Sequence, residues 1–115
     1  MRIALTGATG FLGRYLLRRF CAGGHDVRAW ARGGSDRAGV ESLAEWIDGE
    51  LGDDEAAARL VRGCDSVVHA ALFRPGEAFR GQEGDIVEFA DKNVLGTLRL
   101  IRASIAADVE RFVFI

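Results

Sequence analysis

The chain has 115 residues, the size of one small domain with a hydrophobic core. Its residues are 49% hydrophobic and 28% charged, which excludes a chain that is disordered for lack of apolar side chains. The formal net charge of −2 excludes a strongly basic surface, so nucleic acid is not an expected partner.

Short apolar runs alternate with amphipathic segments along the whole chain. In chain order, the pattern predicts a strand at residues 2–6, a helix at 11–22, a strand at 26–31, a loop at 32–38, a short helix at 40–43, a weak strand within 45–51, a helix from Asp53 or Asp54 to 62, a strand at 66–70, a loop at 73–84, a helix at 85–107 and a strand at 111–115. Strands that alternate with helices require crossover connections and indicate a parallel sheet covered on both faces. We therefore predict an α/β fold with a parallel sheet of about five strands.

Two predicted helices carry apolar stripes. In the helix at 11–22 the stripe includes Tyr15, which we expect in the core. In the helix at 85–107 it comprises Ile86, Phe89, Ala90, Val94, Leu98, Ile101 and Ile105. This second stripe either covers the sheet or joins two copies of the chain in a homodimer.

Nothing in the sequence indicates a membrane or an export signal. The longest apolar stretch, around residues 67–73, is far shorter than the ~20 residues that span a bilayer. The strand at 2–6 leaves no room for a signal peptide. Cys21 and Cys64 fit neither a disulfide framework nor a metal cluster. We expect a cytoplasmic protein without a metal site.

Three glycines stand between the first predicted strand and the first predicted helix, in the segment Thr-Gly-Ala-Thr-Gly-Phe-Leu-Gly. A helix N-terminus there offers unpaired N–H groups to an anion such as a pyrophosphate. Gly7 permits a tight turn, Gly10 the close approach of a phosphate, and Gly13 close packing of helix on strand. The position of the motif in a β-α alternation favours dinucleotide binding over an ordinary glycine-rich turn.

The end of the second strand indicates which dinucleotide is bound. An acidic residue there accepts hydrogen bonds from a ribose 2′-hydroxyl, but this chain has Arg32, followed by Arg37. An arginine suits a 2′-phosphate. The sequence thus favours NADP over NAD as cofactor; the alternative is that both arginines are solvated surface charges.

The segment at 6–13 resembles the glycine motif of the extended short-chain dehydrogenase/reductases, the NAD(P)-dependent epimerase/dehydratase group. Further resemblances lie at residues 49–53, 65–71, 93–97 and 110–114, so that the likeness covers all 115 residues in the family's order. It implies a Rossmann-type, doubly wound α/β fold with about five parallel strands in the order 3-2-1-4-5 and right-handed crossovers. The cofactor-binding residues that the resemblance implies, together with the two arginines, are Gly7, Thr9, Gly10, Phe11, Leu12, Gly13, Arg32, Arg37, Glu50, Leu51, Ala70, Ala71 and Asn93.

The resemblance also gives these residues their places. Glu50 and Leu51 correspond to the stretch beside the adenine, with Glu50 in place of the family's aspartate. Ala70 and Ala71 correspond to the end of the fourth strand, near the nicotinamide-side ribose. Asn93 corresponds to an asparagine that organises the active site.

The family's catalytic pair is absent from this sequence. In the family, Tyr-x-x-x-Lys on the helix after the fifth strand carries the acid–base chemistry of hydride transfer. Here Tyr15 and Lys92 are the only tyrosine and the only lysine, and they do not form that motif. We therefore expect residues 1–115 to be the NAD(P)-binding portion of a longer enzyme, cut before its catalytic residues and substrate domain.

The expected parent is an oxidoreductase, epimerase or dehydratase that acts on a sugar nucleotide or another carbonyl or alcohol substrate. Two alternatives remain open at this point. One is a non-catalytic dinucleotide sensor of the same fold. The other is a self-contained small protein that uses its sheet for partner binding, although an exposed strand at 111–115 is a hazardous edge for such a protein.

Overall fold

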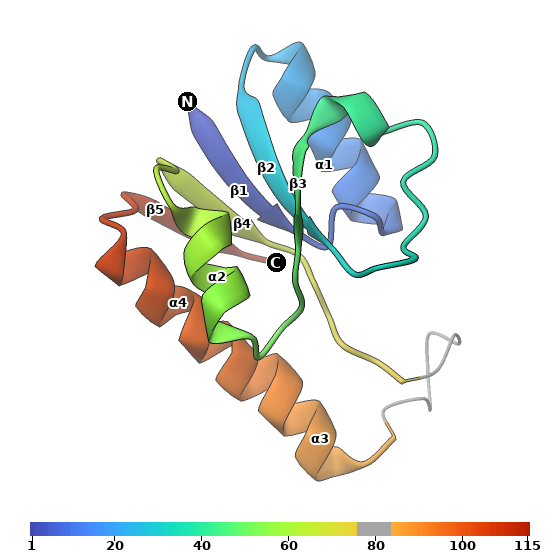
Figure 1. Ribbon diagram of the computed structural model, residues 1–115, viewed down its shortest axis with the longest axis vertical. Helices are drawn as coiled ribbons and strands as arrows, with labels where there is room; N and C mark the ends of the chain where they lie inside the picture. The colour runs from blue at the N-terminus through green and yellow to red at the C-terminus, as the bar shows by residue number, and fades with distance from the viewer. Residues whose placement is uncertain (76–83) are drawn as a thin grey trace.

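The computed structural model describes residues 1–75 and 84–115 and confirms the predicted sheet (Figure 1). Five parallel strands lie in the order β3-β2-β1-β4-β5. They are β1 (Arg2–Thr6), β2 (Asp26–Ala31), β3 (Glu45–Asp48), β4 (Ser66–His69) and β5 (Arg111–Phe114). The predicted loop at 73–84 falls mostly on residues 76–83, which lie outside the described residues.

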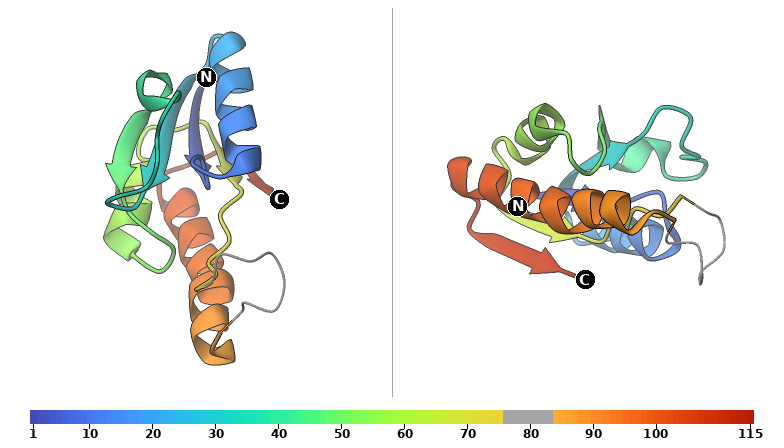
Figure 2. Two further views of the ribbon diagram at one scale, coloured as in Figure 1. Left: turned by 90° about the vertical axis from the view of Figure 1, so that its right-hand side faces the viewer. Right: turned by 90° about the horizontal axis from the view of Figure 1, so that it is seen from below.

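Helices cover both faces of the sheet, as Figure 2 shows edge-on. They are α1 (Phe11–Ala22), the 3-10 turn η1 (Glu41–Leu43), α2 (Asp54–Val61), α3 (Ile86–Ala90), the π-helical turn η2 (Asp91–Leu95) and α4 (Gly96–Ala106). Asp53 caps α2 by accepting a hydrogen bond from the N–H of Ala56, which places the helix start where the acidic residues predicted it.

The alternation of side chains along β1 explains the two cores. Ile3 and Leu5 belong to the apolar cluster that includes Leu17 of α1. Ala4, between them, belongs to the cluster that includes Leu60 of α2. Successive strand residues point to opposite faces, so a strand buried on both sides must be apolar at every position.

The face that α1 buries differs from the prediction. Tyr15 is 60% exposed and Phe11 is 97% exposed, so the expectation that Tyr15 lies in the core was wrong. The helix buries Gly13 and Leu17, and of the predicted stripe Leu16 and Phe20 pack, half-buried, against the core. A Cβ added at Gly13 would lie 1.8 Å from the Gly7 carbonyl oxygen, and this close contact turns the Gly13–Leu17 line toward the sheet.

The segment predicted as one helix at 85–107 is helical throughout, but its middle turn, η2, is π-helical. Most of its apolar stripe is exposed: Ile86, Ala90, Val94, Leu98 and Ile105 are exposed, whereas Phe89 and Ile101 are half-buried. Of the two roles open to the stripe, covering the sheet is therefore wrong. α4 buries Gly96, Leu100 and Ser104. A Cβ at Gly96 would lie 3.1 Å from the Gly52 nitrogen, so small residues bring α4 close to the chain before α2.

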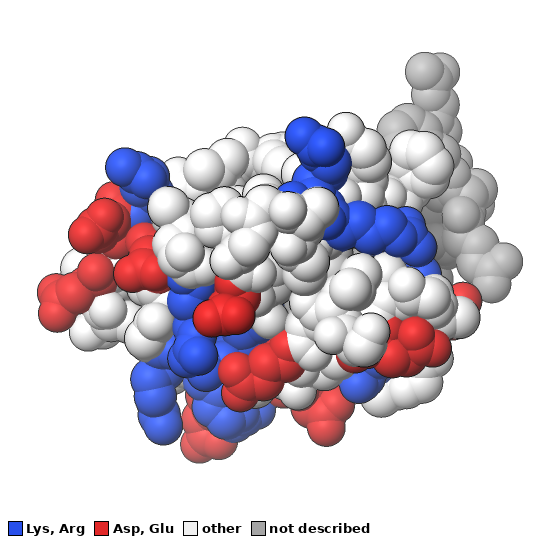
Figure 3. Space-filling model, turned by 90° about the horizontal axis from the view of Figure 1, so that it is seen from above, with Lys and Arg blue, Asp and Glu red and all other residues white. Residues whose placement is uncertain are grey.

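Charges are intermixed on the face seen from above. Acidic and basic side chains lie beside one another there (Figure 3), in keeping with 15 basic and 17 acidic residues in the chain. None of the helices in residues 1–75 and 84–115 is long and apolar enough to cross a membrane.

Substitution of Gly13 by alanine tests the contact between α1 and the residues before it. Because the new Cβ would meet the Gly7 carbonyl, we expect Gly13→Ala to lower the free energy of unfolding by about 3 kcal/mol or more, measured by urea denaturation. Gly33→Ala is the matched control, since a Cβ at Gly33 meets nothing within 4 Å, and it should change stability by less than about 0.5 kcal/mol. Equal stability of the two variants would contradict this account of the packing.

Candidate functional site

The glycine loop, residues 7–10, joins β1 to α1 at the carboxyl ends of the strands. Gly7 has a φ of +75°, and a Cβ there would lie 2.7 Å from the carbonyl carbon of Ala70. Gly7 and Gly13 are thus required by contacts within the protein. Gly10 is different, because a Cβ there would meet nothing closer than the Gly7 oxygen at 3.4 Å. Its surface is open to a ligand.

The first turn of α1 is suited to an anion. Gly10 is the N-cap of this 12-residue helix, no side chain caps it, and the first turn holds no acidic residue. The first N–H groups of a helix have no intrahelical partner, and they carry the positive end of the helix dipole. A phosphate group therefore fits this position on both geometric and electrostatic grounds.

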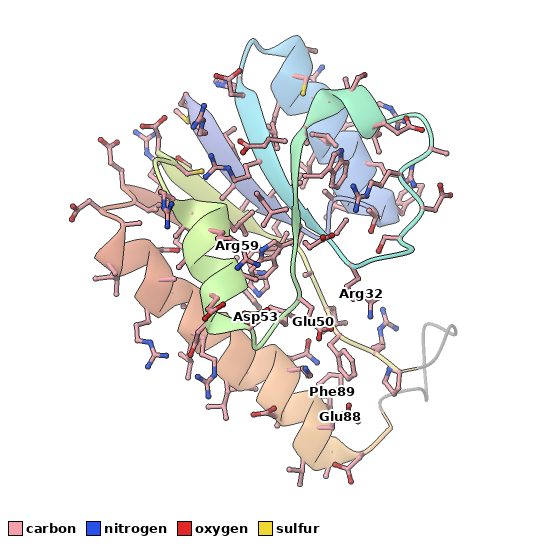
Figure 4. The ribbon with its side chains drawn as sticks, in the orientation of Figure 1. Arg32, Glu50, Asp53, Arg59, Glu88 and Phe89 are labelled. Atoms are coloured by element: carbon pink, nitrogen blue, oxygen red, sulfur yellow. The ribbon has the colours of Figure 1, made fainter. Side chains whose placement is uncertain are left out.

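An open pocket of about 460 Å³ runs from the glycine loop across the carboxyl ends of β2, β1 and β4. Its lining comprises Gly7, Thr9, Gly10, Trp30, Ala31, Arg32, Ser35, Gly49, Glu50, Leu51, Ala70, Ala71, Leu72, Phe73 and Arg74. In Figure 4, Arg32 and Glu50 lie at this same end of the sheet. Its volume is within the range of small-molecule sites, about 300–1,000 Å³.

Most of the residues that the sequence singled out meet in this pocket. Those that line it are Gly7, Thr9, Gly10, Arg32, Glu50, Leu51, Ala70 and Ala71. Those outside its lining are Phe11, Leu12, Gly13, Arg37 and Asn93.

The two arginines after β2 are placed differently. Arg32 is exposed and lines the pocket. Arg37 is outside the lining: a terminal nitrogen lies 3.8 Å from an Asp48 carboxylate oxygen, and the guanidinium lies 5.2 Å from the centre of the Trp46 ring. The structure therefore offers Arg32, with Ser35 beside it in the lining, as the basic group that a ligand meets at this end of the pocket.

Arg14 holds the loop that carries Arg32, a role that the sequence analysis missed. From the second turn of α1, its guanidinium donates hydrogen bonds to the carbonyl oxygens of Thr9 (2.9 Å), Ala38 (2.6 Å) and Asp36. The sequence placed Arg14 on a polar helix face with other arginines, and nothing in that pattern marks it as different from them. One side chain thus ties the glycine loop to the loop at 32–38.

The part of the pocket beside β3 depends on close packing of the Gly49 backbone against the Trp30 and Ala56 side chains. A Cβ at Gly49 would lie 2.8 Å from the Trp30 indole nitrogen, which donates to the carbonyl of Ala56. Leu51 is buried, whereas Glu50 is exposed, with a carboxylate oxygen 3.9 Å from the Lys92 ammonium. An apolar surface at Leu51 with the Glu50 carboxylate at its edge suits a purine with an exocyclic amine.

The other end of the pocket is fixed by Asn93. Its side-chain oxygen accepts a hydrogen bond from the Phe73 N–H at 2.7 Å, and its side-chain nitrogen donates to the Phe73 carbonyl at 3.0 Å. The pocket-lining residues 70–73 are called the wall. Asn93 is outside the pocket lining and positions this wall through the Phe73 backbone.

His69 is the last residue of β4 and immediately precedes the wall in the sequence. It is buried, with 1% of its surface exposed. Its ring nitrogens lie 2.6 Å from the Thr6 hydroxyl and 2.8 Å from the Thr97 hydroxyl. Burial lowers the pKa of the ring to about 4, because desolvation penalises the charged form. The imidazole is therefore neutral near pH 7.

The fold and this site together define an α/β domain of the dinucleotide-binding class. The family model for the NAD dependent epimerase/dehydratase family matches residues 3–115. The chain belongs to the NAD dependent epimerase/dehydratase family.

Individual relatives agree with this assignment. Sterol demethylase protein B of Methylococcus capsulatus is 37% identical over 114 residues, which is 98% of this chain and 33% of that protein. The 4-hydroxy-2-methyl-3-oxo-4-farnesyl-3,4-dihydroquinoline-1-oxide ketoreductase of Stigmatella aurantiaca is 35% identical, over 100% of this chain and 33% of that protein. A short-chain dehydrogenase/reductase superfamily protein from Agrobacterium tumefaciens, solved with bound NAD, superimposes with a TM-score of 0.77 at 30% identity, over 99% of this chain and 32% of its own. The chain thus spans about a third of the length of each of these three proteins.

The buried imidazole predicts how stability depends on pH. The folded-state pKa of about 4 is below the ordinary 6.5, so the unfolded chain binds more protons between these values. The His69 contribution to the free energy of unfolding is present in full above pH 6.5 and falls by about 3 kcal/mol as the pH falls to 4. Urea denaturation at intervals from pH 7.5 to 4 measures it. His69→Gln should show a shallower decline, and parallel curves for the two proteins would contradict the prediction.

Proposed function

We propose that residues 1–115 form the NAD(P)(H)-binding domain of an oxidoreductase of the epimerase/dehydratase type. The observation that carries this proposal is Gly10, which lies open to the pocket at the uncapped start of α1, between two glycines that are closely packed. Such a position accepts a pyrophosphate. The adenosine half then lies toward Arg32 and Leu51, and the nicotinamide half toward the wall formed by residues 70–73.

NADP(H) is the cofactor that we favour. Arg32 is the residue that carries this preference, since an exposed guanidinium in the pocket lining can donate charge-assisted hydrogen bonds to a 2′-phosphate. Asp26 stands at the start of β2, at the opposite end of the strand from the pocket, so it does not take the role of a ribose-binding carboxylate.

The bound cofactor would supply hydride exchange with a sugar nucleotide or another carbonyl or alcohol substrate. Within this chain the glycine loop and Arg32 bind the dinucleotide, and Asn93 orients the wall beside its reactive half. Proton transfer needs a further acid–base group. Tyr15 lies on α1 outside the pocket lining, and Lys92 pairs with Glu50, so we assign that group to residues outside these 115.

A homodimer and a cytoplasmic location also remain proposals. The homodimer is supported by the exposed apolar stripe of α3 and α4, in which Ile86 and Ile105 are 78% and 72% exposed. The cytoplasmic location is supported by Cys21 and Cys64, which are both unpaired.

Gly10→Val tests the phosphate position. A Cβ at Gly10 meets only the Gly7 oxygen, at 3.4 Å, so we expect the fold to be retained, whereas the valine side chain fills the place of the pyrophosphate. We expect loss of binding of both NADPH and NADH in calorimetric titrations, with an unchanged circular dichroism spectrum. Retained affinity would overturn the proposal. If the unsubstituted complete protein binds dinucleotide but oxidises or reduces no substrate, the non-catalytic sensor becomes the better conclusion.

Arg32→Asp tests the choice of cofactor. Replacing the guanidinium by a carboxylate removes the partner of the 2′-phosphate and offers an acceptor to a 2′-hydroxyl, so the ratio of NADPH to NADH affinity should fall by about tenfold or more. Arg111→Asp is the matched control, because it makes the same charge change at the start of β5, at the opposite end of the strands. An unchanged ratio in Arg32→Asp would remove Arg32 from the 2′-phosphate.

A further inference from the structure

A buried line of hydrogen bonds crosses the protein beneath the pocket, with His69 at its centre. On one side, the His69 Nδ1 atom lies 2.6 Å from the Thr6 hydroxyl, at the end of β1. On the other side, Nε2 lies 2.8 Å from the Thr97 hydroxyl, in α4. The line therefore joins the strand before the glycine loop to the helix that carries Asn93.

The direction of each hydrogen bond in this line is determined. The Thr6 hydroxyl oxygen accepts from the N–H groups of Ala70 and Ala71, both at 3.1 Å. A hydroxyl has two acceptor lone pairs and one donor, so its proton must go to the remaining neighbour, His69 Nδ1. The Nδ1 atom is then an acceptor, and the ring proton sits on Nε2.

The hydrogen bonds at the Thr97 end of the line independently place the ring proton on Nε2. The Thr97 hydroxyl donates to the carbonyl oxygen of Asn93 at 2.6 Å. Its proton is thereby used, and it must accept from His69 Nε2–H. Both ends require the same neutral tautomer, and neither leaves an acceptor for a second ring proton.

Each end of the line fixes one part of the same pocket wall. Through Thr6, the ring orients the hydroxyl that holds the N–H groups of Ala70 and Ala71. On the other side, the ring is hydrogen-bonded to Thr97, whose hydroxyl donates to the carbonyl of Asn93. The Asn93 side chain in turn hydrogen-bonds with the N–H and the carbonyl of Phe73. Ala70, Ala71 and Phe73 all line the pocket, whereas His69 is absent from its lining.

We propose that His69 is a positioning residue for the nicotinamide half of the dinucleotide site. In its single tautomer the ring hydrogen-bonds with Thr6 and Thr97 at the same time, and the contacts of these two threonines hold the wall at 70–73. This inference rests on the function proposed above. His69 contacts no ligand itself and acts through Thr6, Thr97 and Asn93.

Thr97→Val tests the proposal in the complete natural protein that contains these residues. The substitution keeps the shape of the side chain and removes the acceptor of His69 Nε2–H. Titrations compare NADP+ with 2′-phospho-adenosine diphosphoribose, which has the same adenosine and pyrophosphate groups but no nicotinamide. We expect Thr97→Val to weaken NADP+ about tenfold and the nicotinamide-free ligand less than about twofold. Thr97→Ser should restore the NADP+ affinity.

Ser104→Ala is the matched control. Ser104 has a buried hydroxyl on the same helix that donates to the carbonyl four residues before it, as the Thr97 hydroxyl does; among the described residues the Ser104 hydroxyl bonds to Leu100 and not to His69. It should leave the affinity for both ligands unchanged. A Thr97→Val variant that weakens both ligands equally, or neither, overturns the role of His69 and leaves the dinucleotide site standing. If the unsubstituted protein binds neither ligand, the proposed function fails as well.

A second measurement does not depend on any variant. Nitrogen-15 spectra of the imidazole in the unsubstituted protein at pH 7 should show a neutral ring with its proton on Nε2. A proton on Nδ1, or on both nitrogens, overturns the proposal even if Thr97→Val fails to fold.

Discussion

The structure depends on one steric constraint, the meeting of three backbones with no side chain between them. The turn at Gly7 lies against the chain leaving β4 at Ala70, and the first turn of α1 lies against the Gly7 carbonyl at Gly13. A Cβ at either glycine would be placed within 3 Å of backbone atoms that have no freedom to move away. This contact fixes the position of α1 on the sheet and the separation of β1 and β4 beyond their last paired residues.

The two halves of the pocket are built outward from that contact by different means. Toward β2, Arg14 uses three backbone carbonyls to hold the loop that carries Arg32. Toward β4 and the long helix, Thr6 and His69 hold the wall through backbone N–H groups and a second hydroxyl. Both sets of hydrogen bonds reach the glycine loop, since Arg14 bonds to Thr9 and Thr6 directly precedes Gly7. A ligand phosphate at Gly10 therefore lies where the two sets meet.

The parallel sheet and the positions of the helices were predictable from sequence because they follow from the alternation of apolar runs with amphipathic segments, and the strand order was predictable from the family resemblance. The faces that the helices bury were not. Tyr15 and Leu98 lie in apolar stripes, yet both are exposed, because Gly13 and Gly96 permit closer packing than larger side chains do. Periodicity identifies where apolar side chains align, but a glycine contact decides which face approaches its neighbour.

The same distinction separates what was predicted at the site from what was not. The glycine motif marks the phosphate position because its requirement is local, a turn followed by a helix start. Arg37 was chosen from sequence for its charge, but it lies beside Asp48 and Trp46 and is outside the pocket lining. Arg14 and His69 were not chosen, since the Arg14 partners in the 32–38 loop are backbone groups more than 20 residues away and the His69 partners are hydroxyls on other elements. Residues that bind a ligand through a local motif are visible in one sequence, whereas residues that position them through distant hydrogen bonds become visible only when the chain is folded.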